Sequence, residues 1–178
     1  ELKLLCDQKY LTKIANAPIV ARYACDKGET TDLTATYYDT SDLTLRKAGC
    51  ALRIRTDGKR FVMTFKARRR EAGKALERGE WKLPVQNMEP DLATLSRLLP
   101  ADTLAAIGHK SLQPMFGTAV RRHTRMLATP LGTIELAVDR GDIVAGDRSE
   151  AISEIELELM KGSVEAIFQL AHELVSHW

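Results

Sequence analysis

The sequence predicts a β-rich α+β protein, an antiparallel sheet with helices packed against it. Three observations support this fold class. Apolar residues recur with a period of two along most of the 178 residues, which is typical of strands. Turn-forming pairs such as Asp57-Gly58 separate several of these segments and favour hairpins. The amphipathic segment 163–175 predicts a helix that packs on the sheet.

Each element follows from its local pattern. Residues 7–23 predict a helix broken at Pro18, and residues 90–107 predict two short helices separated at Pro100, because proline interrupts helical hydrogen bonding. The triplet Arg140-Gly141-Asp142 predicts a hairpin turn. There is no repeat or flexible linker, so residues 1–178 are expected to form a single domain. The expected strands are 1–6, 33–40, 50–56, 60–67, 79–85, 115–127, 132–140, 142–146 and 151–160.

Composition excludes several classes of protein. The chain has 26 basic and 24 acidic residues, so its net field is weak and predicts neither a membrane nor a specific nucleic acid as a partner. No apolar run approaches the ~18 residues that span a bilayer. The three cysteines lack paired spacing, which favours a reducing compartment and a cytoplasmic protein.

Individual strands carry polar faces of nearly one sign. Arg53 and Arg55 alternate with apolar residues in one strand, and Glu154, Glu156 and Glu158 do so in the last. Two arrangements fit this pattern: the charges face solvent on an open sheet, or they line the inside of a closed barrel. The number of strands that share the pattern favours the barrel. The other charged residues on strand faces are Glu1, Lys3, Lys66, Glu80, Arg122, Glu135 and Asp139.

An enclosed row of carboxylates requires cations. Two like charges ~5 Å apart repel by ~3 kcal/mol at an effective dielectric constant of ~20. Carboxylate oxygens suit Mg²⁺ or Mn²⁺, and guanidinium groups match phosphate oxygens. The basic residues that could offset about four negative charges are Arg53, Arg55, Lys66 and Arg122. The acidic and basic sets together predict binding of a polyphosphate with its metal ion.

Eight motifs, in order, resemble those of the CYTH domain of the triphosphate tunnel metalloenzymes. They are E-L-K at the start, Y-Y-D-T, L-R-I-R, T-F-K, R-G-E-W, F-x-T-x-x-x-R, E-L-A-V-D-R-G and E-I-E-L-E-L. More narrowly, the chain resembles the N-terminal domain of bacterial inorganic triphosphatases, which often carry a helical CHAD domain after it. The resemblance implies an eight-stranded antiparallel closed barrel, the triphosphate tunnel, with helices outside. It also implies triphosphate hydrolysis with Mg²⁺ or Mn²⁺.

The resemblance assigns roles to single residues. It implies that Glu1, Glu156 and Glu158 bind metal, and that phosphate is bound by Lys3, Arg53, Arg55, Lys66 and Arg122. The family's signature begins two positions before Glu1, and its last basic strand follows Trp178, so the domain is expected to be shortened at both ends. We expect Glu154 to take the proton of the attacking water. Residues expected to hold the ligands in place are Glu80, Glu135 and Asp139.

Three functions stay open at this point. The first is metal-dependent hydrolysis of inorganic triphosphate to pyrophosphate and phosphate. The second is an enzyme of the same fold that acts on a nucleoside triphosphate or thiamine triphosphate, or that cyclises ATP to cyclic AMP. The third is a non-catalytic module that binds polyphosphate. Rows of carboxylates disfavour the third, because a binder of polyanions gains nothing from them.

Overall fold

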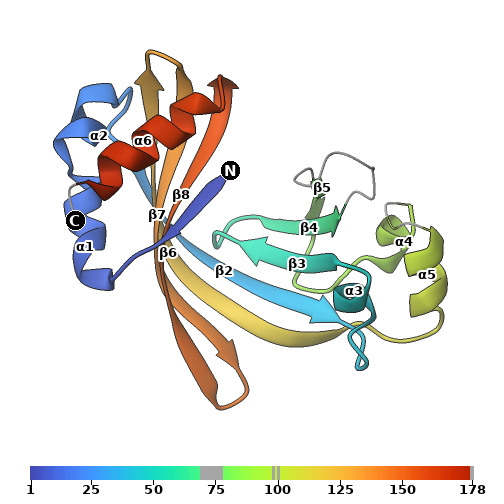
Figure 1. Ribbon diagram of the computed structural model, residues 1–178. Coiled ribbons are helices and arrows are strands. Elements are labelled where there is room, and N and C mark those ends of the chain that lie inside the picture. The colour runs from blue at the N-terminus through green and yellow to red at the C-terminus, as the bar shows by residue number, and fades with distance from the viewer. Residues whose placement is uncertain (69–77, 98, 100, 177–178) are drawn as a thin grey trace. The chain divides into compact units, whose positions relative to one another are not determined.

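The computed structural model describes residues 1–68, 78–97, 99 and 101–176. Figure 1 shows the helices and strands along the chain. They divide into two compact units. Unit 1 comprises Glu1–Asp32, Val120–Asp142 and Glu150–Trp178, and unit 2 comprises Leu33–Ala119 and Ile143–Ser149. Unit 1 therefore contains both ends of the chain, whereas unit 2 is built mainly from its middle.

Eight strands form one sheet in the order β1-β8-β7-β6-β2-β3-β4-β5. Strand β1 pairs with β8, β3 pairs with β2 and β4, and β4 pairs with β5, all antiparallel. The predicted eight-stranded antiparallel fold with helices is confirmed. The strands are β1 (Leu2–Leu5), β2 (Glu29–Asp39), β3 (Cys50–Thr56), β4 (Phe61–Arg68), β5 (Arg78–Val85), β6 (Gln113–Thr129), β7 (Gly132–Ala145) and β8 (Arg148–Gly162).

The sheet differs from the expected closed barrel in one respect. The strand order begins at β1 and ends at β5, and within the described residues no ladder joins these two strands. Strand β1 has four residues, which run from Leu2 opposite Leu157 to Leu5 opposite Glu154. So short a strand offers few backbone groups to a second neighbour besides β8.

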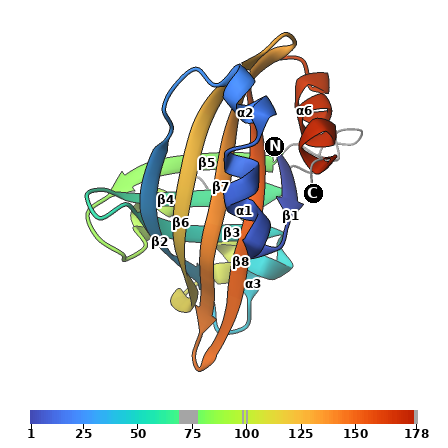
Figure 2. The ribbon, with the colours of Figure 1, turned by 90° about the vertical axis from the view of Figure 1, so that its left-hand side faces the viewer.

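Three helices cover one face of the strands in unit 1. Figures 1 and 2 show α1 (Gln8–Ala15), α2 (Pro18–Tyr23) and α6 (Glu165–Val175) on the same side of β7 and β8. Pro18 is the first residue of α2, which confirms the predicted break. Because side chains alternate along a strand, apolar residues that face the helices leave charged ones on the other face. The core includes Leu11, Ile14, Val20, Ile134, Leu136, Ile155, Leu157, Ile167, Leu170 and Leu174.

Unit 2 has a separate core under three short helices. These are α3 (Thr44–Lys47), α4 (Leu92–Leu95) and α5 (Ala101–Ile107), of which α4 and α5 are the two helices expected within 90–107. The rings of Phe65 and Trp81 pack against each other at 5.8 Å between their centroids. The buried residues of this core are Tyr38, Leu45, Cys50, Leu52, Ile54, Met63, Phe65, Ala67, Leu95 and Ile107.

The sequence pattern does not predict helix α3, which depends on the buried carboxylate of Asp39 at the end of β2. Asp39 is 6% exposed. It accepts hydrogen bonds from the backbone N–H groups of Thr40, Leu45 and Arg46, at 2.7, 2.8 and 3.0 Å. The amides of Leu45 and Arg46 lie at the start of a four-residue helix, where the helix itself provides no acceptors, and that of Thr40 lies in the loop before it. Asp39 therefore stabilises a local structure.

One predicted turn is wrong, and another is confirmed. Strand β7 continues from Gly132 to Ala145, so the strands expected at 132–140 and 142–146 are one strand. Gly141 is not among the residues with positive φ, and its backbone stays extended. At the other turn, Gly58 has φ of 86° between β3 and β4. The Asp57 carboxylate accepts hydrogen bonds from the N–H groups of Lys59 and Arg60, both at 2.9 Å.

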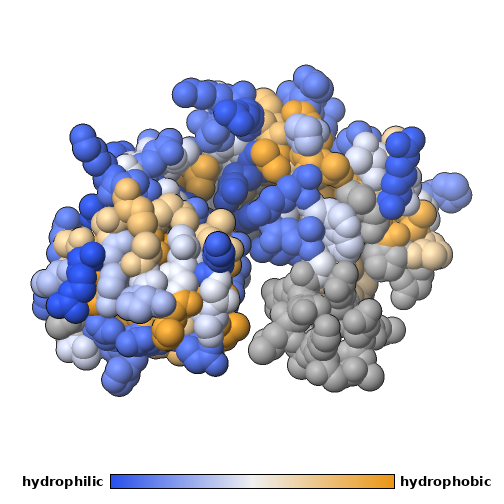
Figure 3. All heavy atoms as spheres, turned by 90° about the horizontal axis from the view of Figure 1, so that it is seen from above, coloured by the Kyte–Doolittle hydropathy of each residue, from blue (hydrophilic) through white to orange (hydrophobic). Residues whose placement is uncertain are grey.

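The surface is mixed in character. The face drawn in Figure 3 is mostly hydrophilic, with scattered hydrophobic areas. Among the described residues, the large hydrophobic side chains that are exposed include one aromatic residue, Phe168 on α6, which is 61% exposed. None of the helices in the described parts of the chain has the length and apolar character needed to cross a membrane.

Candidate metal centre and phosphate-binding face

Three carboxylates from neighbouring strands of unit 1 form a cluster. Asp139 lies on β7, and Glu154 and Glu156 lie on β8. One oxygen from each of these side chains lies within 4.8 Å of the others. The cluster forms because Asp139 and the two glutamates occupy the strand faces opposite the apolar residues that pack under the helices. We call these three residues the acidic cluster.

Lys3 joins the acidic cluster from the other side of β8. It lies opposite Glu156 in the β1–β8 ladder, and its Nζ is 2.8 Å from Glu154 and 2.6 Å from Glu156. Partial burial by itself lowers the pKa of Lys3, but the hydrogen bonds to Glu154 and Glu156 outweigh it and raise the pKa above its usual range. Lys3 is therefore cationic, and its charge faces two carboxylates.

Arg122 on β6 contacts the acidic cluster from the opposite side. Its Nε donates to one oxygen of Asp139 at 2.8 Å, and its NH2 group donates to the other at 2.5 Å and to Glu156 at 2.6 Å. The side chain of Asp139 is only 3% exposed, and that of Arg122 is 20% exposed. Burial opposes the charge on Arg122, but its contacts with Asp139 and Glu156 raise its pKa. A bidentate contact of this kind fixes orientation as well as charge.

The same two cations keep Glu156 ionised. Burial favours the neutral form of this carboxyl, but the hydrogen bond from Lys3 and the charge of Arg122 outweigh that effect and lower its pKa. An ionised carboxylate is the form that binds Mg²⁺ or Mn²⁺. Oxygen ligands at ~2.1 Å from Mg²⁺ lie no more than ~4.2 Å apart. The spacing of oxygens within the acidic cluster is thus close to what such an ion requires.

The other predicted acidic residues of unit 1 lie outside the acidic cluster. Glu1 and Glu158 are exposed. Glu135 is partly buried on β7 and lines a separate open pocket of about 370 Å³ with Asp26 and Arg125. Of the predicted acidic residues in unit 1, the structure therefore brings together Glu154, Glu156 and Asp139. Glu1, Glu135 and Glu158 lie apart from them.

Unit 2 presents cations on the face of β3, β4 and β5 that lies opposite its core. Arg53 and Arg55 alternate with the buried Leu52 and Ile54. Arg53 lies opposite Thr64, and Lys66 lies opposite Glu80. Because residues directly opposite each other share a face, the predicted residues Arg53, Arg55, Lys66 and Glu80 lie on one surface.

Arg53 has an incompletely satisfied guanidinium group. Its NH1 group donates to the hydroxyl of Tyr37 at 3.4 Å, and its buried Nε has no hydrogen-bond partner among the described residues. The Tyr37 ring stacks on Phe116 with 4.4 Å between the centroids, which fixes its position. A buried unpaired donor is costly, so an anionic ligand is a reasonable partner for Arg53.

Lys82 belongs to the same cationic face and is absent from the predicted site. It lies opposite Thr64, two residues from Glu80. The Glu80 carboxylate lies 3.5 Å from both the Nζ of Lys66 and the Nζ of Lys82. The alternation in Glu80-Trp81-Lys82 could have indicated that Lys82 shares a strand face with Glu80. We call Arg53, Arg55, Lys66 and Lys82 the cationic face.

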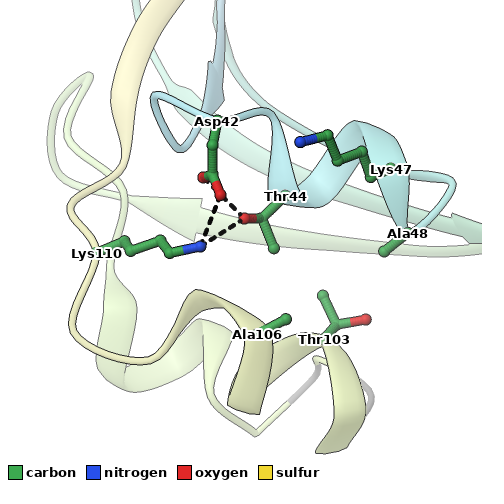
Figure 4. A pocket seen from close by; sticks show the side chains of 7 residues that line it. All are labelled: Asp42, Thr44, Lys47, Ala48, Thr103, Ala106 and Lys110. Atoms are coloured by element: carbon green, nitrogen blue, oxygen red, sulfur yellow. Dashed lines mark hydrogen bonds and ion pairs between the residues drawn. The ribbon is translucent and has the colours of Figure 1, made fainter.

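In a further pocket of unit 2, Asp42, Thr44 and Lys110 contact one another (Figure 4). It has a volume of about 360 Å³ and lies between α3 and α5. The Nζ of Lys110 is 2.7 Å from Asp42, and Thr44 donates to the same carboxyl group at 3.1 Å. This ion pair joins two loops of unit 2, so we assign these residues a role in stabilising the fold.

A model of the CYTH domain family matches residues 1–177. The chain belongs to the CYTH family. A curated relative of this CYTH domain, from Haemophilus influenzae, is named inorganic triphosphatase and is 35% identical over 140 residues. The match covers 78% of this chain but only 39% of the relative, so the chain spans well under two thirds of that protein's length.

Two solved structures resemble this CYTH domain in fold. A candidate adenylate cyclase from Bacillus halodurans is 20% identical to this chain, with a TM-score of 0.62. The match covers 99% of this chain and 87% of that one. A candidate adenylyl cyclase from Hippeastrum, described as having a dominant triphosphatase activity, is 15% identical. Its TM-score is 0.56, with coverage of 98% and 84%. At such low sequence identities, the similarity to these two structures shows the fold only. The chemistry is argued from the residues of the site.

Proposed function

We propose that this CYTH domain hydrolyses inorganic triphosphate to pyrophosphate and phosphate with a divalent metal ion. The observation that carries the proposal is the acidic cluster, in which three carboxylates from β7 and β8 converge within 4.8 Å. The activity named for the Haemophilus influenzae relative supports it. The residues present fit Mg²⁺ or Mn²⁺, since all three offer the hard oxygen ligands that these ions prefer.

Asp139, Glu154 and Glu156 would hold the metal ion in this proposal. When bound, the ion would polarise the terminal phosphoryl group and make a water molecule more acidic. Arg122 holds Asp139 and Glu156 in a fixed orientation, and its predicted contact with phosphate remains a proposal. Glu1 and Glu158 remain proposed ligands on the strength of the family motifs alone, because both are exposed outside the acidic cluster.

The cationic face would bind phosphate oxygens. Guanidinium groups offer paired donors to phosphate, and the buried Nε of Arg53 supports such a contact. Arg55 and Lys66 would contribute charge on the same face, and Glu80 would orient Lys66. When triphosphate is bound, these groups would offset the negative charge of its phosphate oxygens.

Glu154 would accept the proton of the attacking water. The ion pair of Glu154 with Lys3 uses Oε1, which leaves Oε2 to accept a proton. Glu135 lines a separate pocket, so it could influence the metal ligands only through its charge. We place the activity in the cytoplasm, because Cys6, Cys25 and Cys50 form no disulfide within the described residues, which fits a reducing compartment. The greater length of the relative leaves room for the CHAD domain that the resemblance implies.

Phosphate release from triphosphate, measured with Mg²⁺, with Mn²⁺ and with EDTA, tests the proposal. We expect turnover only with metal, and a loss of at least about 100-fold in Glu156→Gln. Glu150→Gln, which changes an exposed residue of the same strand, is the matched control. Metal-independent turnover or full activity in Glu156→Gln would contradict the proposal.

Parallel assays distinguish the alternative functions. Faster turnover of ATP or thiamine triphosphate, or formation of cyclic AMP, would favour an organic substrate. Tight polyphosphate binding that survives Glu156→Ala, with no hydrolysis by either protein, would favour a non-catalytic binding module.

A further inference from the structure

The acidic cluster already has close contacts with two cations. Lys3 contacts Oε1 of Glu154 and Oε1 of Glu156. Arg122 contacts Oε2 of Glu156 and both oxygens of Asp139. Five carboxylate oxygens thus lie at 2.5–2.8 Å from a cationic nitrogen. A divalent ion bound by the acidic cluster would need some of the same oxygens.

The two cations are held differently. Arg122 is 20% exposed and makes three contacts from a rigid planar group. Lys3 is 45% exposed, and its ammonium group sits at the end of a flexible chain on the four-residue strand β1. Both contacts of Lys3 come from a single atom, so one rotation of the side chain would break them together. Lys3 is therefore the more exchangeable of the two.

Charge balance explains why an exchange would occur. Three carboxylates and two cations leave the group with one net negative charge. A divalent ion within the acidic cluster would repel the nearby ammonium group, which would then favour an anion. An ammonium group has three donors and can bind phosphate oxygens as readily as carboxylates.

We propose that Lys3 is an exchangeable counter-ion of the metal centre, which competes with the divalent ion for Glu154 and Glu156 and turns to the phosphate when the ion binds. This inference rests on the proposed function. It makes metal and triphosphate binding cooperative, because each ligand favours the same position of one side chain. Such coupling is reciprocal between the two ligands.

Substitution of Lys3 by methionine tests the competition through binding, without turnover. We expect Lys3→Met to bind Mn²⁺ alone about tenfold more tightly than the unaltered protein, measured by electron paramagnetic resonance. The same variant should bind triphosphate more weakly, by about fivefold, when calorimetry is done in EDTA. Lys3→Arg keeps the charge and should not tighten Mn²⁺ binding. Lys9→Met removes an exposed lysine paired with Asp7 and should leave both affinities unchanged.

The two opposite changes separate this role from a structural one. If Lys3 only supports the fold, Lys3→Met weakens both ligands, and that result would overturn the inference. Unchanged Mn²⁺ affinity would overturn it as well, while the proposed function would stand. Absence of Mn²⁺ binding by the unaltered protein would overturn both.

A second measurement needs no variant. The ε-carbon resonance of Lys3, in protein with ¹³C-labelled lysine, should shift on addition of Mg²⁺ and shift again with triphosphate. A resonance unmoved by Mg²⁺ would show that Lys3 stays on its carboxylates, contrary to the proposal.

Discussion

The acidic cluster of unit 1 and the cationic face of unit 2 handle charge in different ways. In unit 1, three carboxylates contact two cations directly at 2.5–2.8 Å. On β3–β5 of unit 2, the carboxylate of Glu80 lies beside the cationic face, at 3.5 Å from the Nζ of Lys66 and from that of Lys82. The acidic cluster is therefore nearly balanced by its two cations, whereas on the cationic face the described ion pairs are longer and the buried Nε of Arg53 has no hydrogen-bond partner among the described residues.

This difference indicates two kinds of ligand. A nearly balanced group can take up a divalent cation only by loosening an existing contact. A face whose described ion pairs are long, and which holds an unpaired donor on Arg53, can bind an anion without such an exchange. Substitutions in the two regions should therefore have different consequences: changes in the acidic cluster should affect folding and metal together, and changes on the cationic face should affect mainly phosphate binding.

The largest effect is expected from Asp139→Asn. Loss of this charge leaves Arg122 buried with an incomplete partner, which should lower the free energy of unfolding by about 3 kcal/mol. It should also abolish tight Mn²⁺ binding. Urea unfolding and Mn²⁺ titration measure the two effects. Asp147→Asn, in the exposed turn after β7, is the control. A variant as stable as this control would show that the Arg122–Asp139 pair contributes little.

The strands and their charged faces can be predicted from local sequence. Arg53 and Arg55, or Glu154 and Glu156, alternate with apolar residues, and alternation alone places each pair on one face. The helix break at Pro18 is equally local. The eight-motif resemblance adds the strand number and the family, which no single motif would establish.

The combination of residues within each site is not local and is harder to predict. Lys3 meets Glu156 because the first and last strands pair, a register that no short pattern encodes. Asp139 belongs to the acidic cluster because Arg122 of the preceding strand fixes its carboxylate. Turn-forming residues also mislead at Arg140-Gly141-Asp142, where an extended glycine continues the strand through the predicted turn.

The next largest effect is expected from Asp39→Ala, in the unit with the cationic face. This acid serves three backbone amides rather than a cation, and its loss should lower the free energy of unfolding by about 2–3 kcal/mol with little effect on Mn²⁺ binding. Asp32→Ala, exposed on the same strand, is the control.

Asp39→Ala and Asp139→Asn also test the expectation of one domain. If residues 1–178 unfold as a single domain, both variants shift one common transition. Two separable transitions, each sensitive to one variant, would contradict that expectation.

Arg53→Met tests the cationic face, where we expect a change in phosphate binding without a change in stability. A charged hydrogen bond to phosphate contributes about 1.5–3 kcal/mol, so triphosphate affinity should fall by about 10-fold to 100-fold. Stability should not fall, because the buried Nε has no partner among the described residues. Calorimetric titration and urea unfolding measure the two effects, with Arg97→Met as the exposed control. A large loss of stability would show that the guanidinium group has a structural role.

The smallest effect is expected from Lys82→Met. Lys82 is 59% exposed and shares Glu80 with Lys66, so the pair contributes little to stability. Removing one lysine leaves the carboxylate wholly to Lys66, which draws that ammonium group further from phosphate. Triphosphate affinity should therefore fall by about twofold, slightly more than loss of one distant charge would cause. Lys13→Met, exposed on α1, provides the comparison in the same calorimetric assay. Equal affinities of these two variants would show that Lys82 lies outside the phosphate-binding surface, which would then consist of Arg53, Arg55 and Lys66.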